Sequence, residues 1–261
     1  MQSIQRAAQN KFEAQCRVLI NLGFHMSIKR EDVICIIPAR GGSKGLPGKN
    51  IKLIGNEPLI SRPIRHAIES RVIGTVLVTT DSDEIAQIAK KSGAIVPFIR
   101  PSNLAEDLTT TEDALRHALV TYEQMAGKKF ELAVFLTATD IFRNPEWIKE
   151  GIIKMENNPK LESVFSGHAT HKNFWEEQDD GSWKRIKDWM AGYSSRQIRR
   201  HVVREDTGLM CVSRAWLWRE GRRIGDNIDI IVNEDDFTSI DIHHEEDLRL
   251  ANEAVKIRSN V

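Results

Sequence analysis

The chain has 261 residues, and its 37 Lys and Arg side chains balance 37 Asp and Glu side chains, so the formal net charge at pH 7 is zero. That length suits one large α/β domain, and the neutral balance argues against nucleic acid or an anionic membrane surface as a partner. Three cysteines without a CxxC spacing indicate neither a disulfide framework nor a zinc site. No apolar run reaches the roughly 20 residues of a membrane span, so we expect a cytoplasmic protein.

The N-terminal segment is weakly amphipathic and lacks the apolar core of a secretion signal. We therefore expect residues 1–26 to be an appendage to a domain that spans residues 27–261. A helix packed on the surface of that domain is the alternative.

From residue 33 onward, strand patterns alternate with helical patterns. The run VICIIPA (33–39) is apolar and rich in β-branched residues, as in a strand buried on both faces. Thr109 and Glu112 have the spacing of a capping box at the start of one helix. Successive βα units predict a doubly wound, mostly parallel sheet with helices on both faces. Further strands are expected at 75–81, 94–100 and 131–139, with helices at 58–70, 83–93 and 109–125.

The alternation stops near residue 165. Residues 168–205 are polar and aromatic, with DDGS (179–182) as a turn between two flanks. We expect a hairpin or arm that projects from the domain, with a hairpin folded back onto the core as the alternative. Regular patterns return at 207–218, 228–233 and 238–243, followed by a last helix at 245–257.

One loop combines unusual backbone freedom with positive charge. The segment IIPARGGSKGLPGKN (36–50) places four glycines, one arginine and two lysines directly after the first predicted strand. Ligands bind at the carboxyl ends of strands in doubly wound sheets. Glycines let the backbone N–H groups approach an anion, and Lys and Arg add further donors. The segment therefore predicts a cradle for a polyphosphate.

Two common phosphate-binding motifs do not match this loop. A Walker A motif fails because Gly48 and Lys49 are followed by Asn50 instead of Ser or Thr. The dinucleotide fingerprint fails because the glycines at 42, 45 and 48 are spaced three and three. A flexible surface loop is the alternative, and the buried type of strand before it argues against that interpretation.

The loop closely resembles the N-terminal motif of the acylneuraminate cytidylyltransferase family. This family holds the CMP-sialic acid synthetases and their relatives for legionaminic and pseudaminic acids, and its motif runs Pro-Ala-Arg-x-x-Ser-Lys-Gly and then Lys-Asn. A weaker resemblance extends from about residue 33 to 255 and includes IRPSNLAEDLTTTEDAL and SIDIHHEEDLRLANEA. It implies a Rossmann-like nucleotide-diphospho-sugar transferase fold. It also implies that the segment at 168–205 is an inserted dimerisation arm, so we expect a homodimer.

The resemblance implies a reaction between CTP and an acidic 2-keto sugar. The anomeric hydroxyl attacks the α-phosphorus in line, giving a CMP-sugar and pyrophosphate, with a metal and fixed cations neutralising the triphosphate. Arg40 and Lys49 are implied to stabilise the leaving pyrophosphate. Arg100 and Thr111 fall where the family contacts the cytosine and ribose, with a surface charge and a helix-start residue as alternatives. The implied nucleotide-binding set is Arg40, Ser43, Lys44, Lys49, Asn50, Arg100 and Thr111.

The sugar side departs from the family pattern. Relatives read Leu-Gln-Pro-Thr-Ser-Pro-Leu-Arg after the fourth strand, whereas this chain reads LTATDIFR, so that Thr137 replaces the sugar-contacting Gln and Arg143 is kept. Arg196 and Gln197 are candidates for the sugar carboxylate, because Arg suits bidentate carboxylate recognition; solvated surface groups are the alternative. We take all four as candidate substrate-binding residues.

The residues expected to bind the metal also differ from the family pattern. Relatives end in Asp-Ile-Asp, but here Asp241 is followed by His243 in the second place. Mg²⁺ prefers oxygen ligands to imidazole. We expect Mg²⁺, with Mn²⁺ as an alternative, held by Asp241 and by Asp140 as the replacement carboxylate. The alternatives are Asp241 with only triphosphate oxygens and water, Asp140 as a turn residue, His243 as a helix-entry residue, and a weakly active site.

The sequence thus predicts a CTP-dependent cytidylyltransferase for a sialic-acid-like nonulosonate other than ordinary sialic acid. Two alternatives remain. One is a degenerate homologue that only binds nucleotide, and the other is a cytidylyltransferase for a non-ulosonate acceptor such as a phosphonate.

Overall fold

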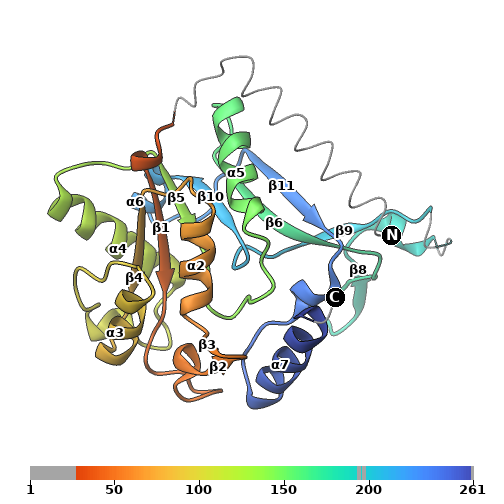
Figure 1. Ribbon diagram of the computed structural model, residues 1–261. Helices are drawn as coiled ribbons and strands as arrows, with labels where there is room; N and C mark the ends of the chain where they lie inside the picture. The colour runs from red at the N-terminus through yellow and green to blue at the C-terminus, as the bar shows by residue number, and fades with distance from the viewer. Residues whose placement is uncertain (1–27, 193–194, 196–197, 260–261) are drawn as a thin grey trace.

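The computed structural model describes residues 28–192, 195 and 198–259. The predicted appendage at 1–26 and the candidate substrate residues Arg196 and Gln197 lie outside the described residues. Within them the central feature is a seven-stranded sheet with helices on both faces (Figure 1). Its strands are β1 (Val33–Pro38), β4 (Thr75–Thr79), β5 (Leu132–Phe135), β6 (Ser163–Thr170), β9 (Val202–Glu205), β10 (Cys211–Arg214) and β11 (Ile228–Asn233).

The sheet is mostly parallel, as predicted. The strands follow the order β11-β6-β10-β5-β1-β4, with β9 attached to β6. Strand β1 pairs in parallel with both β4 and β5, and β11 pairs in parallel with β6, whereas β10 is antiparallel to its two neighbours and β9 to β6. The carboxyl ends of β1, β4 and β5 therefore meet at one edge of the sheet.

Alternate residues of β1 enter two separate cores, as in a strand buried on both faces. Val33, Cys35 and Ile37 pack in the core beneath α2, α3, α5 and α7, while Ile34 and Ile36 pack beneath α4 and α6. The helices span Ser61–Glu69 (α2), Asp83–Lys91 (α3), Thr111–Ala126 (α4), Glu146–Asn157 (α5), Ala215–Arg219 (α6) and Glu245–Ser259 (α7). None of the described helices is long and apolar enough to cross a membrane.

The strand predicted at 94–100 does not form. Ile95 makes a single parallel bridge with Leu77, and the chain then leaves the sheet. Pro97 has no N–H to continue the ladder. The backbone N–H of Arg100 instead donates to the carbonyl of Thr80 at 2.7 Å, which brings that arginine back to the edge where the strands end.

The start of α4 lies one residue away from the predicted capping box. Thr110 is the N-cap, and its hydroxyl accepts the backbone N–H of Asp113 at 3.1 Å. Three consecutive threonines offer nearly equivalent caps. The capping-box spacing alone favoured Thr109 and could not distinguish it from Thr110. The shift makes Thr111 the first residue of the helix.

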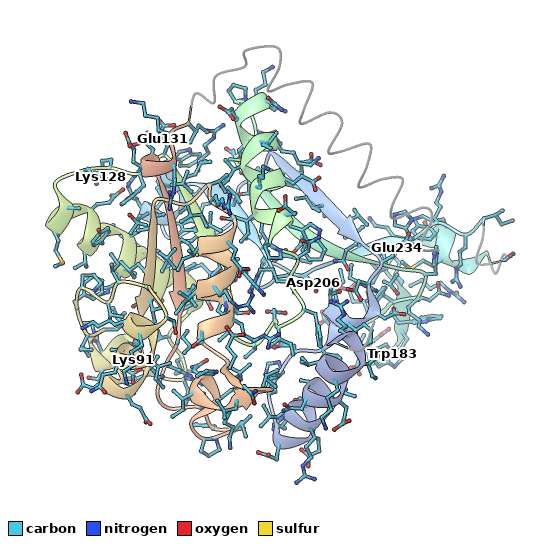
Figure 2. All side chains as sticks on the ribbon, in the orientation of Figure 1. Lys91, Lys128, Glu131, Trp183, Asp206 and Glu234 are labelled. Carbon is cyan, nitrogen blue, oxygen red and sulfur yellow. The ribbon has the colours of Figure 1, made fainter. Side chains whose placement is uncertain are left out.

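The predicted hairpin is present as a separate two-stranded sheet of β7 (Trp175–Glu177) and β8 (Trp183–Arg185). Gly181 in its turn has a φ of 78°, which suits glycine. The hairpin does not cover the core, because Trp175 and Trp183 are 45% and 61% exposed. Figure 2 shows Trp183 at the outer side of the molecule, beyond the end of the central sheet. A second short hairpin, β2 (Leu53–Ile54) and β3 (Glu57–Pro58), follows the glycine-rich loop.

Candidate active site

A cavity of about 520 Å³ lies at the carboxyl ends of β1 and β5. The glycine-rich loop, the loop before α4, the loop after β5 and the entry to α7 surround it. Thr137, from the predicted sugar side, also lines this cavity. All seven residues of the implied nucleotide-binding set line it: Arg40, Ser43, Lys44, Lys49, Asn50, Arg100 and Thr111.

The glycine-rich loop is fastened to the entry of α7. A Cβ at Gly45 would lie 2.7 Å from the carbonyl oxygen of His243, so only glycine permits this approach. The ammonium of Lys49 donates to the carbonyl of Ile242 at 3.0 Å, and the amide of Asn50 donates to the carbonyl of Arg40 at 3.0 Å. The glycine-rich loop and the segment that carries Asp241, far apart in the sequence, are therefore held together in the fold.

One carboxylate pairs with two of the cations that line the cavity. Asp107 accepts a hydrogen bond from Arg40 at 3.1 Å and forms a close ion pair with Lys44. The hydrogen bond from Lys44 holds the pKa of this carboxyl below its usual value. Asp107 was not singled out from the sequence, although it lies in the quoted segment IRPSNLAEDLTTTEDAL; only the fold reveals that it faces the glycine-rich loop.

Replacing Asp107 by asparagine should tighten the binding of CTP by about 2- to 5-fold, the order of one exposed ion pair. An anionic triphosphate must compete with this carboxylate for Arg40 and Lys44. Titration calorimetry at fixed ionic strength measures the change. The control is Glu106→Gln, since Glu106 lines the same cavity without an ion pair among the described residues. An equal gain in both variants would contradict specific competition by Asp107.

Arg100 is a buried cation in the cavity wall. Its side chain is 4% exposed and lies 3.7 Å from the carboxylate of Asp81. Burial lowers the pKa of the guanidinium, and the charge of Asp81 opposes this effect. Within the described part of the chain its Nε has no hydrogen-bond partner, so a donor is available at the cavity wall.

Asp140 and Asp241 are brought side by side by an isolated antiparallel bridge, 101 residues apart in sequence. Burial, and then the charge of Asp241, raises the pKa of Asp140 to about 6. The Oδ1 atom of Asp241 is buried and has no partner among the described residues. A carboxylate pair with an unsatisfied oxygen fits Mg²⁺, which takes one or two carboxylates and completes its shell with substrate phosphates and water. In the described ranges no three His, Cys, Asp or Glu side chains converge to form a fuller protein cage.

Asp140→Asn should stabilise the metal-free protein at neutral pH. A raised pKa means that the folded state binds more protons than the unfolded state between about pH 4 and 6, so stability falls as the pH rises through this window. The difference in unfolding free energy between variant and wild type should therefore grow by about 2 kcal/mol from pH 4 to pH 7.

Urea unfolding in the presence of EDTA measures this difference. The exposed substitution Asp179→Asn, which makes the same change of charge on the surface, is the control. A difference that stays constant between pH 4 and pH 7 would show that the Asp140 carboxylate is not penalised by burial.

Arg143 does not line the cavity. Its side chain is buried, and the guanidinium donates to the carbonyls of Thr137 and Gly208 at 3.0 and 2.7 Å and also to that of Leu209. Every one of these acceptors belongs to the backbone, so the side chain ties the loop after β5 to the turn before β10. These contacts give Arg143 a structural role, while its Nη1 has no partner among the described residues and the sugar contact expected from the sequence stays a prediction.

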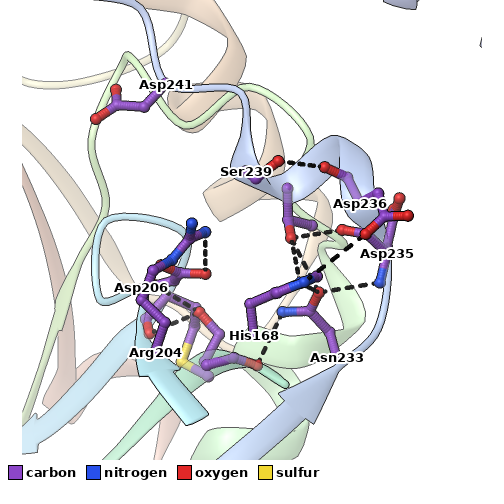
Figure 3. A network of polar contacts seen from close by, with 12 residues as sticks. His168, Arg204, Asp206, Asn233, Asp235, Asp236, Ser239 and Asp241 are labelled. Atoms are coloured by element: carbon purple, nitrogen blue, oxygen red, sulfur yellow. Dashed lines mark hydrogen bonds and ion pairs between the residues drawn. The ribbon is translucent and has the colours of Figure 1, made fainter. Parts of the chain in front are cut away.

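A polar network supports the segment that leads to Asp241 (Figure 3). Asn233, at the end of β11, donates to the carbonyl of Gly167 at 3.0 Å and accepts from the hydroxyl of Thr238 at 2.9 Å. His168 lies 3.4 Å from both Asn233 and Thr238. The network anchors the chain two to three residues before Asp241, and no sequence motif had pointed to it.

Fold and cavity together define an α/β protein with a cation-rich cavity at one edge of its sheet and a carboxylate pair beside it. A family model described as "Cytidylyltransferase" matches residues 34–207. Because that match covers more than half of the sequence, the chain belongs to the cytidylyltransferase family, and the resemblance found in the sequence is confirmed.

Individual relatives are named for CMP-sugar synthesis. The chain is 38% identical over 120 residues to a CMP-N,N'-diacetyllegionaminic acid synthase of Legionella pneumophila, covering 46% of this chain and 51% of the relative. It thus spans about half the length of that relative. It is 29% identical over 228 residues to the synthase of the same name from Campylobacter jejuni, covering 87% of this chain and 97% of the relative.

Solved structures confirm the fold. A CMP:2-keto-3-deoxy-manno-octonic acid synthetase complexed with CTP superposes with a TM-score of 0.61 at 15% identity, covering 87% of this chain and 99% of that chain. A 4-diphosphocytidyl-2C-methyl-D-erythritol synthase from Anaerococcus prevotii superposes with a TM-score of 0.57 at 15% identity, covering 86% and 98%.

Proposed function

We propose that the protein transfers CMP from CTP to the anomeric hydroxyl of an acidic 2-keto sugar of the nonulosonate class and releases pyrophosphate. The observation that carries this proposal is the convergence of the whole implied nucleotide-binding set on one cavity beside the pair Asp140 and Asp241. The names of the Legionella and Campylobacter relatives support the sugar class. A cytoplasmic location is part of the proposal.

The residues of the cavity suit an in-line displacement. The acceptor oxygen forms a bond to the α-phosphorus and its hydroxyl proton is released to solvent, while the bond from that phosphorus to the bridging oxygen breaks and pyrophosphate leaves with the electron pair. Arg40 and Lys49 neutralise the charge that develops on the leaving group. What supports this role for Lys49 is that it lines the cavity and that the charges of Asp241 and Asp140 raise its pKa against the lowering caused by burial, which favours the charged ammonium.

Asp140 and Asp241 are the residues that would hold Mg²⁺ or Mn²⁺. When bound, the cation supplies positive charge to the triphosphate oxygens. The two carboxylates would otherwise repel the triphosphate, so the pair serves the reaction only in combination with a cation.

The acceptor is proposed to differ from ordinary sialic acid. Thr137 lines the cavity where the relatives carry a sugar-contacting Gln, and its hydroxyl is engaged by Asp140. A screen of pyrophosphate release from CTP should cover legionaminic, pseudaminic, sialic and 2-keto-3-deoxy-octonic acids and an aminoalkyl phosphonate. Turnover with legionaminic or pseudaminic acid is expected, and preferential turnover of sialic acid would refute this part of the proposal.

The same screen addresses the alternatives. Turnover only with the phosphonate would favour a non-ulosonate enzyme. No turnover, combined with tight CTP binding that Asp241→Ala leaves unchanged, would favour a nucleotide-binding module. In an enzyme, Asp241→Ala should abolish pyrophosphate release.

The protein is further proposed to form a homodimer through the arm. Trp175 and Trp183 are exposed on the hairpin, as are Phe174 and Ile186 beside it, and aromatic residues are enriched at interfaces. Trp175→Ser with Trp183→Ser should shift the mass in sedimentation equilibrium from dimer to monomer. Trp216→Ser, at an exposed aromatic on α6, is the control and should leave the mass unchanged.

A further inference from the structure

His243 stands where the related sequences carry a second carboxylate, and its contacts define what it does here. Its Nε2 lies 2.8 Å from the Oδ2 atom of Asp241. The other carboxylate oxygen, Oδ1, is the buried atom without a partner in the described part of the chain. The imidazole therefore engages one oxygen of Asp241 and leaves the other available.

The backbone around His243 is fixed from two sides. Its N–H and that of His244 both donate to the carboxylate of Asp247, at 2.9 and 2.8 Å. Its carbonyl oxygen packs against Gly45, where even a Cβ would come within 2.7 Å. Because the backbone of His243 is fixed and its imidazole contacts Asp241, the side chain of His243 restricts the orientation of that carboxylate.

Thr137 makes the equivalent contact with the other carboxylate. Its hydroxyl forms a close hydrogen bond with the Oδ2 atom of Asp140 and lies 3.3 Å from the backbone N–H of the same residue. Its own backbone N–H donates to the carbonyl of Gly208 at 2.9 Å. Thr137 is therefore itself held by the turn before β10.

We propose that His243 and Thr137 are positioning residues for the Asp241–Asp140 pair, each holding one oxygen of one carboxylate, and that neither contacts the divalent cation. Fixing a ligating carboxylate by a hydrogen bond from a neighbouring side chain typically changes metal affinity by about 10- to 100-fold. The inference rests on the proposed function for the role of the cation, but it concerns the geometry of the pair and is testable without turnover.

The binding of Mn²⁺ alone, followed by electron paramagnetic resonance without nucleotide, tests His243. His243→Gln keeps an amide N–H near the position of Nε2 and should retain the Mn²⁺ affinity within about 3-fold. His243→Leu removes the donor and should weaken binding by about 10-fold or more. The neighbouring His244→Leu is the control and should change the affinity by less than about 2-fold.

Three results would overturn the assignment of His243. The first is that His243→Gln and His243→Leu weaken Mn²⁺ binding equally. The others are a nitrogen coupling to Mn²⁺ in pulsed spectra of the wild type that His243→Gln removes, and the absence of saturable Mn²⁺ binding at millimolar concentration. The proposed function fails separately. If the variants bind Mn²⁺ as expected but the protein releases no pyrophosphate with any acceptor, the positioning roles stand and the proposed cytidylyltransferase activity is refuted.

Thr137 is tested with the same probe and a stability measurement. Thr137→Val should weaken Mn²⁺ binding by about 10-fold, and Thr137→Ser, which keeps the hydroxyl, should restore it. Thr170→Val is the control, since the Thr170 hydroxyl accepts a backbone N–H at 3.2 Å and Thr170 does not line the cavity. A loss of thermal stability in Thr137→Val with unchanged Mn²⁺ affinity would show a merely structural role and overturn the proposal for this residue.

Discussion

Replacing Arg40 and Lys49 together by methionine should abolish detectable CTP binding and lower kcat/KM by about 10³-fold or more. Both side chains line the cavity, and burial lowers the pKa of Lys49 while Asp241 and Asp140 oppose that effect. A cation held in a partly dry site interacts strongly with the developing charge of pyrophosphate, and removing one such group commonly costs about 10²- to 10³-fold. Methionine keeps most of the apolar stem, so the loss reports on charge.

The matched control is Lys52→Met with Lys90→Met. It removes the same net charge at positions outside the cavity, where Lys52 faces Glu245 at 3.7 Å. Titration calorimetry with CTP and Mg²⁺, followed by pyrophosphate release with the best acceptor, makes the comparison. Intact turnover in the Arg40 and Lys49 variant would remove the basis for placing the triphosphate in the glycine-rich loop.

Gly208→Ala should lower kcat by about 10²-fold, although the change adds only a methyl group. A Cβ at this position would lie 2.0 Å from the Oδ2 atom of Asp140 and 2.9 Å from the hydroxyl of Thr137. The methyl group must displace the carboxylate of Asp140, and displacement by about 1 Å at a reacting site commonly costs 10²-fold. Overpacking should also destabilise the fold by about 1–3 kcal/mol.

The kcat of Gly208→Ala is best compared with that of Gly192→Ala, which meets only ordinary contact at 3.6 Å from the carbonyl of Trp189. Measuring the Mn²⁺ affinity together with kcat separates displacement of the Asp140 carboxylate from general destabilisation of the fold, because only the former should weaken Mn²⁺ binding. Reduced stability with wild-type kcat and Mn²⁺ affinity would mean that Asp140 takes no part in the site.

The place of the glycine-rich loop at the cavity was predictable because its signal is local, and its binding of phosphate stays a prediction. Residues 33–50 hold a strand of the buried type followed directly by glycines and cations. The position of such a loop at the strand ends follows from the general rule for doubly wound sheets. The predicted hairpin was equally local, because its turn residues lie at 179–182. The family resemblance then placed Arg100 and Thr111 at the same cavity, where the structure has them.

Errors arose where neighbouring positions are nearly equivalent or where a pattern competes with a backbone constraint. The cap of α4 moved from Thr109 to Thr110 because both can accept a hydrogen bond. The segment 94–100 has strand composition, but Pro97 removes a ladder donor, and the chain turns back at Arg100. Arg143 matched a family position, and its guanidinium donates to backbone carbonyls, so the sugar contact expected for it stays a prediction.

The sequence by itself determined the sheet type, the position of the glycine-rich loop and the family, because hydrophobic period, glycine spacing and charge are properties of contiguous residues. Only the tertiary structure decided that Asp140 meets Asp241, that Asp107 pairs with Arg40 and Lys44, and that His243 turns toward a carboxylate. These contacts depend on how separate loops converge at one sheet edge. Side-chain direction there is set by packing and burial, which no local pattern of residues encodes.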